Sequence, residues 1–279
     1  MTENEHPILV FAHANGFPAG SYRRFLDPLS RDYRIAAPEK LAHHADYPPA
    51  PNWSALADEL LDFIAARTPE PVIGVGHSMG GVFTFLAALR QPRRFRAFVM
   101  LDPPAPFGPS AWFVAMAKRL GFVDRLTPAG RTAGRRAHWP DREQALAYFR
   151  SRDLFRNFDP RCLEDYVEAG TERTAEGLQL VYDPDREVAI YRNVPHDLMT
   201  QPAPVRVPGA IVVGSASNVT RRSDARRMAR RHDLLVSEVD GGHMFPLEHP
   251  GAAAAHVGRV IVQLLDRDEV ERRRSRGKA

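Results

Sequence analysis

Short apolar runs bounded by turn residues alternate with helix-like segments along most of this chain of 279 residues. Short continuous apolar runs of this kind are typical of strands buried on both faces of a parallel sheet. The segment SALADELLDFIAART, between two runs, repeats its leucines at helical spacing. The alternation predicts an α/β fold with a mostly parallel central sheet and flanking helices. The predicted strands are 7–13, 33–38, 71–77, 95–102, 207–215 and 234–240.

Residues 104–205 interrupt this alternation. The segment is rich in proline at its start and rich in arginine throughout, and it contains helix-like stretches such as SAWFVAMAKRLG and REQALAYFR. We therefore expect a core made of residues 1–103 and 206–279, with a helical lid, residues 104–205, inserted between two core strands.

The overall charge and the single cysteine narrow the classes of protein to consider. The 38 Lys and Arg exceed the 34 Asp and Glu by only four, which is far from the charge of a typical nucleic-acid-binding protein. Cys162 is the only cysteine, so no internal disulfide or cysteine-based metal site is expected. We find neither a signal peptide nor a run of about 20 apolar residues. We expect a cytoplasmic monomer or homodimer that acts on a small molecule, without nucleic acid, membrane, metal or cofactor.

The stretch VIGVGHSMGG, residues 72–81, places a serine between two glycines directly after an apolar run. Ser78 could be a turn residue or a nucleophile. A nucleophilic serine on a sharp strand-to-helix turn needs small neighbours, which Gly76 and Gly80 supply. It also needs a base, a group that orients the base and donors for an oxyanion.

In this pattern the sequence resembles the serine-type α/β-hydrolase family, from HANG near the start to GGH near the end. The resemblance implies the α/β-hydrolase fold and a nucleophile, an acid and a histidine in that chain order. Ser78 would be the nucleophile, and His243, in VDGGHMFPLEHP, would be the base. The resemblance also implies that the backbone N–H groups of Asn15 and Met79 form the oxyanion hole, with His13 bracing the HANGF loop.

The acid is harder to assign from the sequence. Many family members carry it after the strand that here ends in IVVGSASNV, but Ser215, Ser217 and Asn218 occupy these positions. Asp102 ends the strand at 95–102, from which other members supply the acid. We predict Asp102 as the acid, and the alternative is a turn aspartate before Pro103.

Other candidate positions have two interpretations each. Apolar lid residues could contact the substrate or pack the lid itself, and a trio of arginines could bind an anion or form a solvated face. Adjacent His43 and His44 lack a carboxylate at metal-binding spacing. Glu187, in the lid-like pattern GLQLVYDPDREVAIYR, would brace the lid. The predicted substrate contacts are Phe17, Phe107, Trp112 and Phe245, and the arginines are Arg131, Arg135 and Arg136.

These features predict a hydrolase that cleaves a carboxylic ester or thioester of a small apolar molecule through an acyl-enzyme. A C–C bond hydrolase could use the same residues. A non-catalytic small-molecule-binding protein on the same fold is the alternative from another functional class.

Overall fold

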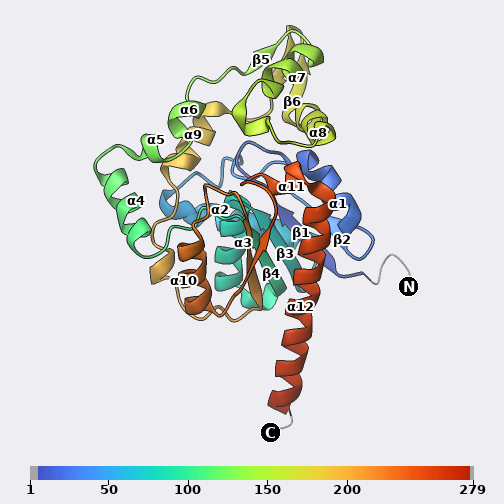
Figure 1. Cartoon of the computed structure of the whole chain (residues 1–279), viewed down its shortest axis with the longest axis vertical. Helices are drawn as coiled ribbons and strands as arrows, with labels where there is room; N and C mark the ends of the chain where they lie inside the picture. The colour runs from blue at the N-terminus through green and yellow to red at the C-terminus, as the bar shows by residue number, and fades with distance from the viewer. Residues whose placement is uncertain (1–5, 277–279) are drawn as a thin grey trace.

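The computed structural model describes residues 6–276 and contains a six-stranded sheet at its centre (Figure 1). The strand order is β2-β1-β3-β4-β8-β9, and each neighbouring pair is parallel. Each of the six predicted strands is present. Their bounds are β1 Ile8–Ala12, β2 Arg34–Ala36, β3 Val72–His77, β4 Phe95–Leu101, β8 Gly209–Gly214 and β9 Leu235–Val239.

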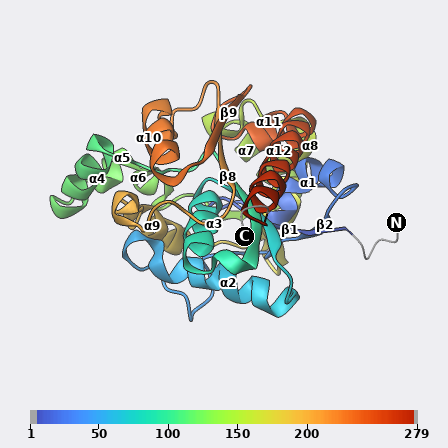
Figure 2. The same cartoon turned by 90° about the horizontal axis from the view of Figure 1, so that it is seen from below.

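Helices cover both faces of the sheet, as seen from below in Figure 2. Alternate residues of a strand point to opposite faces, so Leu9 and Phe11 of β1 join one hydrophobic cluster, whereas Val10 and Ala12 join another. The first cluster includes α1 (Arg23–Leu29) and α12 (Pro250–Arg276). The second includes α2 (Ser54–Arg67), α3 (Met79–Arg90) and α10 (Arg222–His232). None of the described helices is both long and apolar enough to cross a membrane.

The segment between β4 and β8, called the insertion here (residues 104–205), lies across one end of the sheet (Figure 1). It packs on the core through aromatic side chains, since Phe17 contacts Phe155, Phe158 and Tyr166. Its helices are α4 Pro109–Arg119, α5 Val123–Leu126, α6 Ala129–Thr132, α7 Arg142–Arg150, α8 Pro160–Gly170 and α9 Pro184–Arg192.

The insertion also contains a small antiparallel sheet that the sequence analysis did not predict. The order is β5-β7-β6, with β5 at His138–Trp139, β7 at Gly177–Leu180 and β6 at Thr171–Thr174. These strands are two to four residues long, and most of β6 is exposed. They therefore lack the apolar pattern that marks the core strands, and the sequence-based expectation of a helical insertion did not include them.

Candidate active site

Ser78 lies at the sharp turn between β3 and α3. Its backbone has φ 54° and ψ −119°, a conformation that costs energy for a residue with a side chain. The turn is tight because an added Cβ at Gly76 would lie 2.2 Å from the Gly80 carbonyl oxygen. One at Gly80 would lie 2.1 Å from the Ala12 carbonyl oxygen. Both glycines are therefore needed for the turn that presents Ser78.

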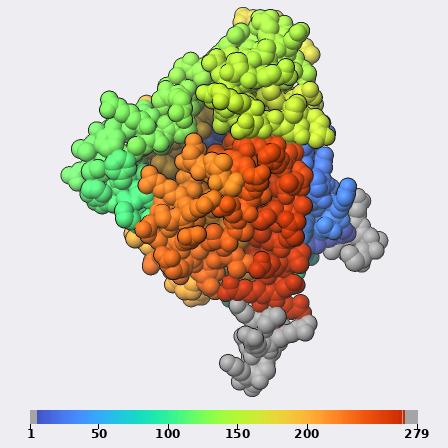
Figure 3. Space-filling view, viewed as in Figure 1, coloured from blue at the N-terminus to red at the C-terminus, as the bar shows by residue number. Residues whose placement is uncertain are grey.

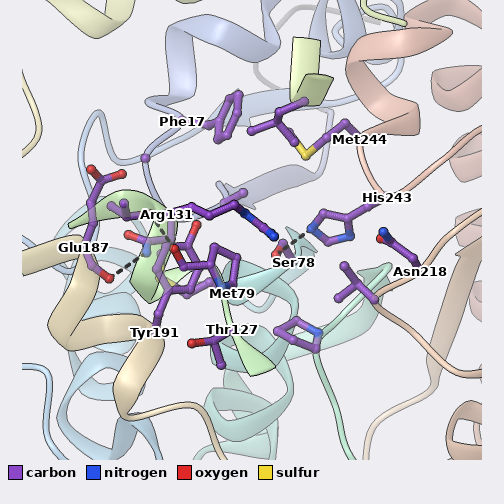
Figure 4. Close-up of a pocket in the computed structure, with 18 of the residues that line it drawn as sticks. Phe17, Ser78, Met79, Thr127, Arg131, Glu187, Tyr191, Asn218, His243 and Met244 are labelled. Atoms are coloured by element: carbon purple, nitrogen blue, oxygen red, sulfur yellow. Dashed lines mark hydrogen bonds between the residues drawn. The ribbon is translucent and has the colours of Figure 1, made fainter. Parts of the chain in front are cut away.

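His243 connects Ser78 to Asp102. Its Nε2 lies 3.1 Å from Ser78 Oγ (Figure 4). Its Nδ1 lies 2.7 Å from Asp102 Oδ2. A carboxylate accepts hydrogen bonds, so it holds the proton on Nδ1 and leaves the Nε2 lone pair facing the serine hydroxyl. The structure thus brings together the three residues predicted from distant parts of the sequence.

Asp102 is fully buried at the end of β4, with a positive φ of 43°. Its Oδ1 accepts the Gly214 N–H at 3.0 Å, and its Oδ2 accepts the Ser217 hydroxyl at 2.5 Å as well as His243. These bonds compensate the cost of burying a carboxylate. Ser217 stands after β8, where many family members carry the acid, and here its side chain supports Asp102 instead.

Asn15 and Met79 both line the pocket beside Ser78. Met79 is the first residue of α3, whose N-terminal end favours negative charge. Within residues 6–276, neither backbone N–H donates a hydrogen bond to a protein acceptor. Both groups are therefore free to bind an oxygen atom of a ligand.

The loop that carries Asn15 is fixed by buried His13. His13 Nε2 accepts the Leu41 N–H at 2.7 Å, so Nδ1 carries the proton and donates it to the Ala14 carbonyl at 2.9 Å. Burial lowers the pKa of His13 to about 4, which keeps the ring neutral at pH 7. His13 thus braces the loop and does not act as a base.

A buried series of hydrogen bonds links the loop that carries Asn15 to His243. The sequence analysis did not predict this series. The Ala14 N–H donates to Tyr22 Oη at 3.4 Å, and Tyr22 donates to His77 Nδ1 at 2.7 Å. His77 Nε2–H then donates to the His243 carbonyl at 2.9 Å. Burial lowers the pKa of His77 well below its ordinary value, so the ring is neutral. The only sequence signal was a histidine next to Ser78 in a buried strand.

A cavity of about 1390 Å³ lies above Ser78, between the core and the insertion. Figure 3 shows the hollow between the insertion, in green, and the core, in orange and red. Phe17 lies in the cavity wall, as predicted, close to Met244 (Figure 4). Apolar residues of the insertion that line it include Phe113, Val114, Val123, Leu126, Phe149 and Phe155.

Three predicted substrate contacts do not line this cavity. Trp112 is 67% exposed on the outer side of α4, whereas Phe113, the next residue along the helix, faces the cavity. Phe107 is buried in the core, with its ring 6.4 Å from that of His232. Phe245 is also buried, with its ring 6.3 Å from that of His77. We therefore correct these predictions: two of the side chains pack the interior, and the third faces solvent.

The three predicted arginines all line the cavity but differ in their partners. Arg135 Nη2 lies 2.5 Å from the carboxylate of Glu187, which is 2% exposed. Arg136 donates to the His138 carbonyl at 2.7 Å and lies over the Trp139 ring. Arg131 has no hydrogen bond or ion pair from its side chain to another described residue.

Glu187 joins the insertion to the Asn15 loop. Its backbone carbonyl accepts the Asn15 side-chain amide at 3.2 Å (Figure 4), and its carboxylate packs on Gly16, where an added Cβ would lie 2.1 Å from Oε1. Burial raises the pKa of Glu187 to about 7, and Arg135 partly opposes this. These contacts are consistent with the brace expected of Glu187.

His43 and His44 do not face each other in a metal site. The His43 ring packs edge-on against Tyr182 at 4.5 Å between centroids, and His44 is exposed. Across the described part of the chain, no group of three or more His, Cys, Asp or Glu is arranged to hold a metal ion.

A comparison with protein-family models addresses the chain as a whole. The model described as the alpha/beta hydrolase family matches residues 9–257. The chain belongs to this family. Members of the alpha/beta hydrolase family are usually enzymes, and the fold of this chain is the one that they share.

Curated relatives of this alpha/beta hydrolase cover only part of it. A type I acyl-CoA thioesterase, mpaH, of Penicillium brevicompactum is 35% identical over 118 residues. The match covers 40% of this chain and 25% of the relative. The mpaH protein of Penicillium roqueforti is 34% identical over 107 residues, covering 38% of this chain and 22% of that protein. The matches span about a quarter of these relatives' length.

Solved structures of alpha/beta hydrolases superpose over nearly the whole chain. E-2-(acetamidomethylene)succinate hydrolase gives a TM-score of 0.74 at 20% identity and covers 92% of both chains. A thioesterase domain from the curacin biosynthetic pathway gives a TM-score of 0.68 at 19% identity and covers 91% of both chains. At these identities the likeness shows the fold alone.

Proposed function

We propose that this alpha/beta hydrolase cleaves a carboxylic ester or thioester of a small, largely apolar molecule through an acyl-enzyme. The observation that carries the proposal is the hydrogen-bonded series from Ser78 through His243 to buried Asp102. The series ends in a cavity that is partly open to solvent and has a partly apolar wall. The insertion would act as the lid of this cavity.

In the proposed reaction, Ser78 Oγ attacks the acyl carbon while its proton passes to His243 Nε2. The N–H groups of Asn15 and Met79 stabilise the negative oxygen of the tetrahedral intermediate. The bond to the leaving group then breaks, and His243 returns the proton to the departing oxygen or sulfur. Water, deprotonated by His243, attacks the acyl-enzyme, releases the acid and regenerates Ser78. Asp102 keeps His243 in the required tautomer and stabilises its protonated form.

The relatives that match part of the chain support a thioester as one substrate, because both are named acyl-CoA thioesterases. Esters and thioesters share the acyl-enzyme and differ in the leaving atom. The proposal therefore includes both, and the leaving group is decided by experiment.

The test is hydrolysis of p-nitrophenyl esters and acyl-CoA thioesters of increasing chain length. We expect turnover by the wild type and its loss in Ser78→Ala and His243→Ala. Fluorophosphonate should label Ser78 in the wild type but not in Ser78→Ala. Exposed His249→Ala is the matched histidine control, and it should retain full activity.

Two results would contradict the proposal. Tight ligand binding without turnover or labelling would favour the non-catalytic binder. Labelling of Ser78 combined with cleavage of a β-diketone, but of no ester or thioester, would favour the C–C bond hydrolase.

A further inference from the structure

Arg131 extends from the insertion into the cavity, toward Ser78 and His243 (Figure 4). It is located on α6, a short helix on the insertion side of the cavity. The guanidinium thus brings a positive charge to the cavity that holds the proposed nucleophile.

The carboxylates of the cavity wall already have hydrogen-bond or ion-pair partners. Glu187 faces Arg135, and Asp153 pairs with Arg156. Asp224 accepts from Ser110 and Arg227, and Glu248 accepts the Gly242 N–H. Among the described residues, no carboxylate that lines the cavity forms an ion pair with Arg131.

An unpaired guanidinium has a direct consequence for what enters this cavity. A neutral substrate that displaces water from Arg131 leaves a charge with poorer solvation, which costs free energy. An anionic group replaces that water with two parallel, charge-assisted hydrogen bonds. Arg136 and Arg152 also line the cavity, and their guanidinium groups lie over aromatic rings. Both are cations, so they add to the positive potential that Arg131 creates in the cavity.

We propose that Arg131 is a specificity-determining residue that binds an anionic group, of the carboxylate type, on the substrate of this hydrolase. The inference rests on the proposed function, since it refines the substrate class of the same site. The anionic group could belong to the acyl part or to the leaving group, and the guanidinium would recognise it in the same way.

Matched substrates test the proposal and separate the two sources. 4-Nitrophenyl hydrogen adipate carries a carboxylate on the acyl side, and 4-nitrophenyl hexanoate is its neutral counterpart. 4-Carboxyphenyl hexanoate carries the carboxylate on the leaving group, and phenyl hexanoate is its neutral counterpart. We expect Arg131→Gln to lower kcat/KM for one anionic ester by about 10- to 100-fold, the usual effect of losing a hydrogen bond to a charged group. The matching neutral ester should change less than about threefold.

Two matched variants control for the change of charge. Arg125→Gln removes an exposed arginine of α5, close in sequence, that does not line the cavity, and it should leave both esters unaffected. Arg221→Gln removes the other cavity arginine whose side chain has no partner among the described residues. Arg131→Lys should recover part of the preference, because it restores the charge but not the two-pronged geometry.

Equal losses for the anionic and neutral esters in Arg131→Gln would overturn the proposal, as would a selective loss in Arg221→Gln alone. A direct binding measurement does not require turnover. It therefore tests the anion site separately from the proposed function. Adipate, 4-hydroxybenzoate and the neutral hexanamide are titrated into the wild type and Arg131→Gln by calorimetry. Weaker binding of either anion in Arg131→Gln, with hexanamide binding unchanged, supports the anion site even if no ester is cleaved. Unchanged binding of both anions overturns it.

Discussion

On the core side of the cavity, Ser78, His243 and Asp102 hold one another through short hydrogen bonds, and Asp102 has two further donors. On the insertion side, Arg131 has no partner within the described chain, and Glu187 is buried with a raised pKa. The ionisable side chains of the core side are partnered before any ligand arrives, whereas Arg131 on the insertion side has no such partner within residues 6–276. In the proposed function, reactivity would belong to the core and selection of the substrate to the insertion.

The largest expected effect is on the core side. Asp102→Asn should lower kcat for any ester that the wild type cleaves by about 10⁴-fold, because an amide no longer holds His243 in the required tautomer. The measurement is a steady-state assay, with circular dichroism to confirm the fold. Asp240→Asn, at an exposed carboxylate, is the control and should be active. Full activity of Asp102→Asn would show that the acid lies elsewhere.

The next effect concerns the insertion side and pH. Folded Glu187 keeps its proton up to about pH 7, whereas the ordinary glutamate pKa is 4.5. The folded state therefore binds more protons than the unfolded state between these values, and Glu187 lowers stability as pH rises. The shift corresponds to about 3 kcal/mol in the free energy of unfolding between pH 4 and pH 8.

Glu187→Gln should remove this part of the pH dependence. The measurement is the difference in urea unfolding free energy between wild type and variant at several pH values, in which contributions of the buried histidines cancel. Asp185→Asn, at an exposed carboxylate of α9, should leave the wild-type pH dependence in place. A difference that does not vary with pH would mean that Glu187 is ionised throughout.

A smaller effect on stability is expected from breaking the series of hydrogen bonds that runs through His77. His77→Phe leaves the Tyr22 hydroxyl and the His243 carbonyl without their partner, so the free energy of unfolding should fall by about 1–3 kcal/mol. Activity should fall as well, because the carbonyl belongs to the proposed base. Chemical denaturation and the ester assay measure the two effects. His249→Phe, at the surface, is the control, and equal stabilities of the two variants would contradict the role of His77.

The smallest effect is expected at Trp112, on the outer side of the insertion. Trp112→Ala should change the free energy of unfolding and the KM for apolar esters only slightly, by about 0.5 kcal/mol or less, because the side chain is 67% exposed. Phe113→Ala, one residue further along α4, should raise KM because Phe113 lines the cavity. Similar KM values for these variants would show that the insertion side does not select the substrate.

The sequence predicted the core better than the insertion for a physical reason. Core strands are buried on both faces, so their residues are apolar almost without interruption, as in β3 and β8. The strands of the insertion are short and partly exposed, and β6 reads TERT. Which side of α4 faces the cavity depends on how the helix packs on its neighbours, so Phe113 and Trp112 could not be distinguished from the sequence alone.

In the candidate site, residues in local motifs could be predicted from the sequence, whereas those that depend on distant partners could not. Ser78 and His243 stand in local motifs, and Asp102 stands at the end of a recognisable strand, so the sequence alone identified the residues that the structure brings together. Their catalytic roles remain predictions. Tyr22 and His77 act through partners far along the chain, and their connection could not be predicted without the tertiary structure.

The hydrogen bonds from Ala14 through Tyr22 and His77 to His243 also bear on how the protein is made. A ribosome produces Ala14 before His243. The same series of hydrogen bonds connects the loop that carries Ala14 to the loop that carries His243. A nascent chain that stops before residue 243 lacks both the proposed base and the carbonyl that His77 binds. If Ser78 acts as proposed, it therefore has no base until the segment that follows β9 has been made and has folded.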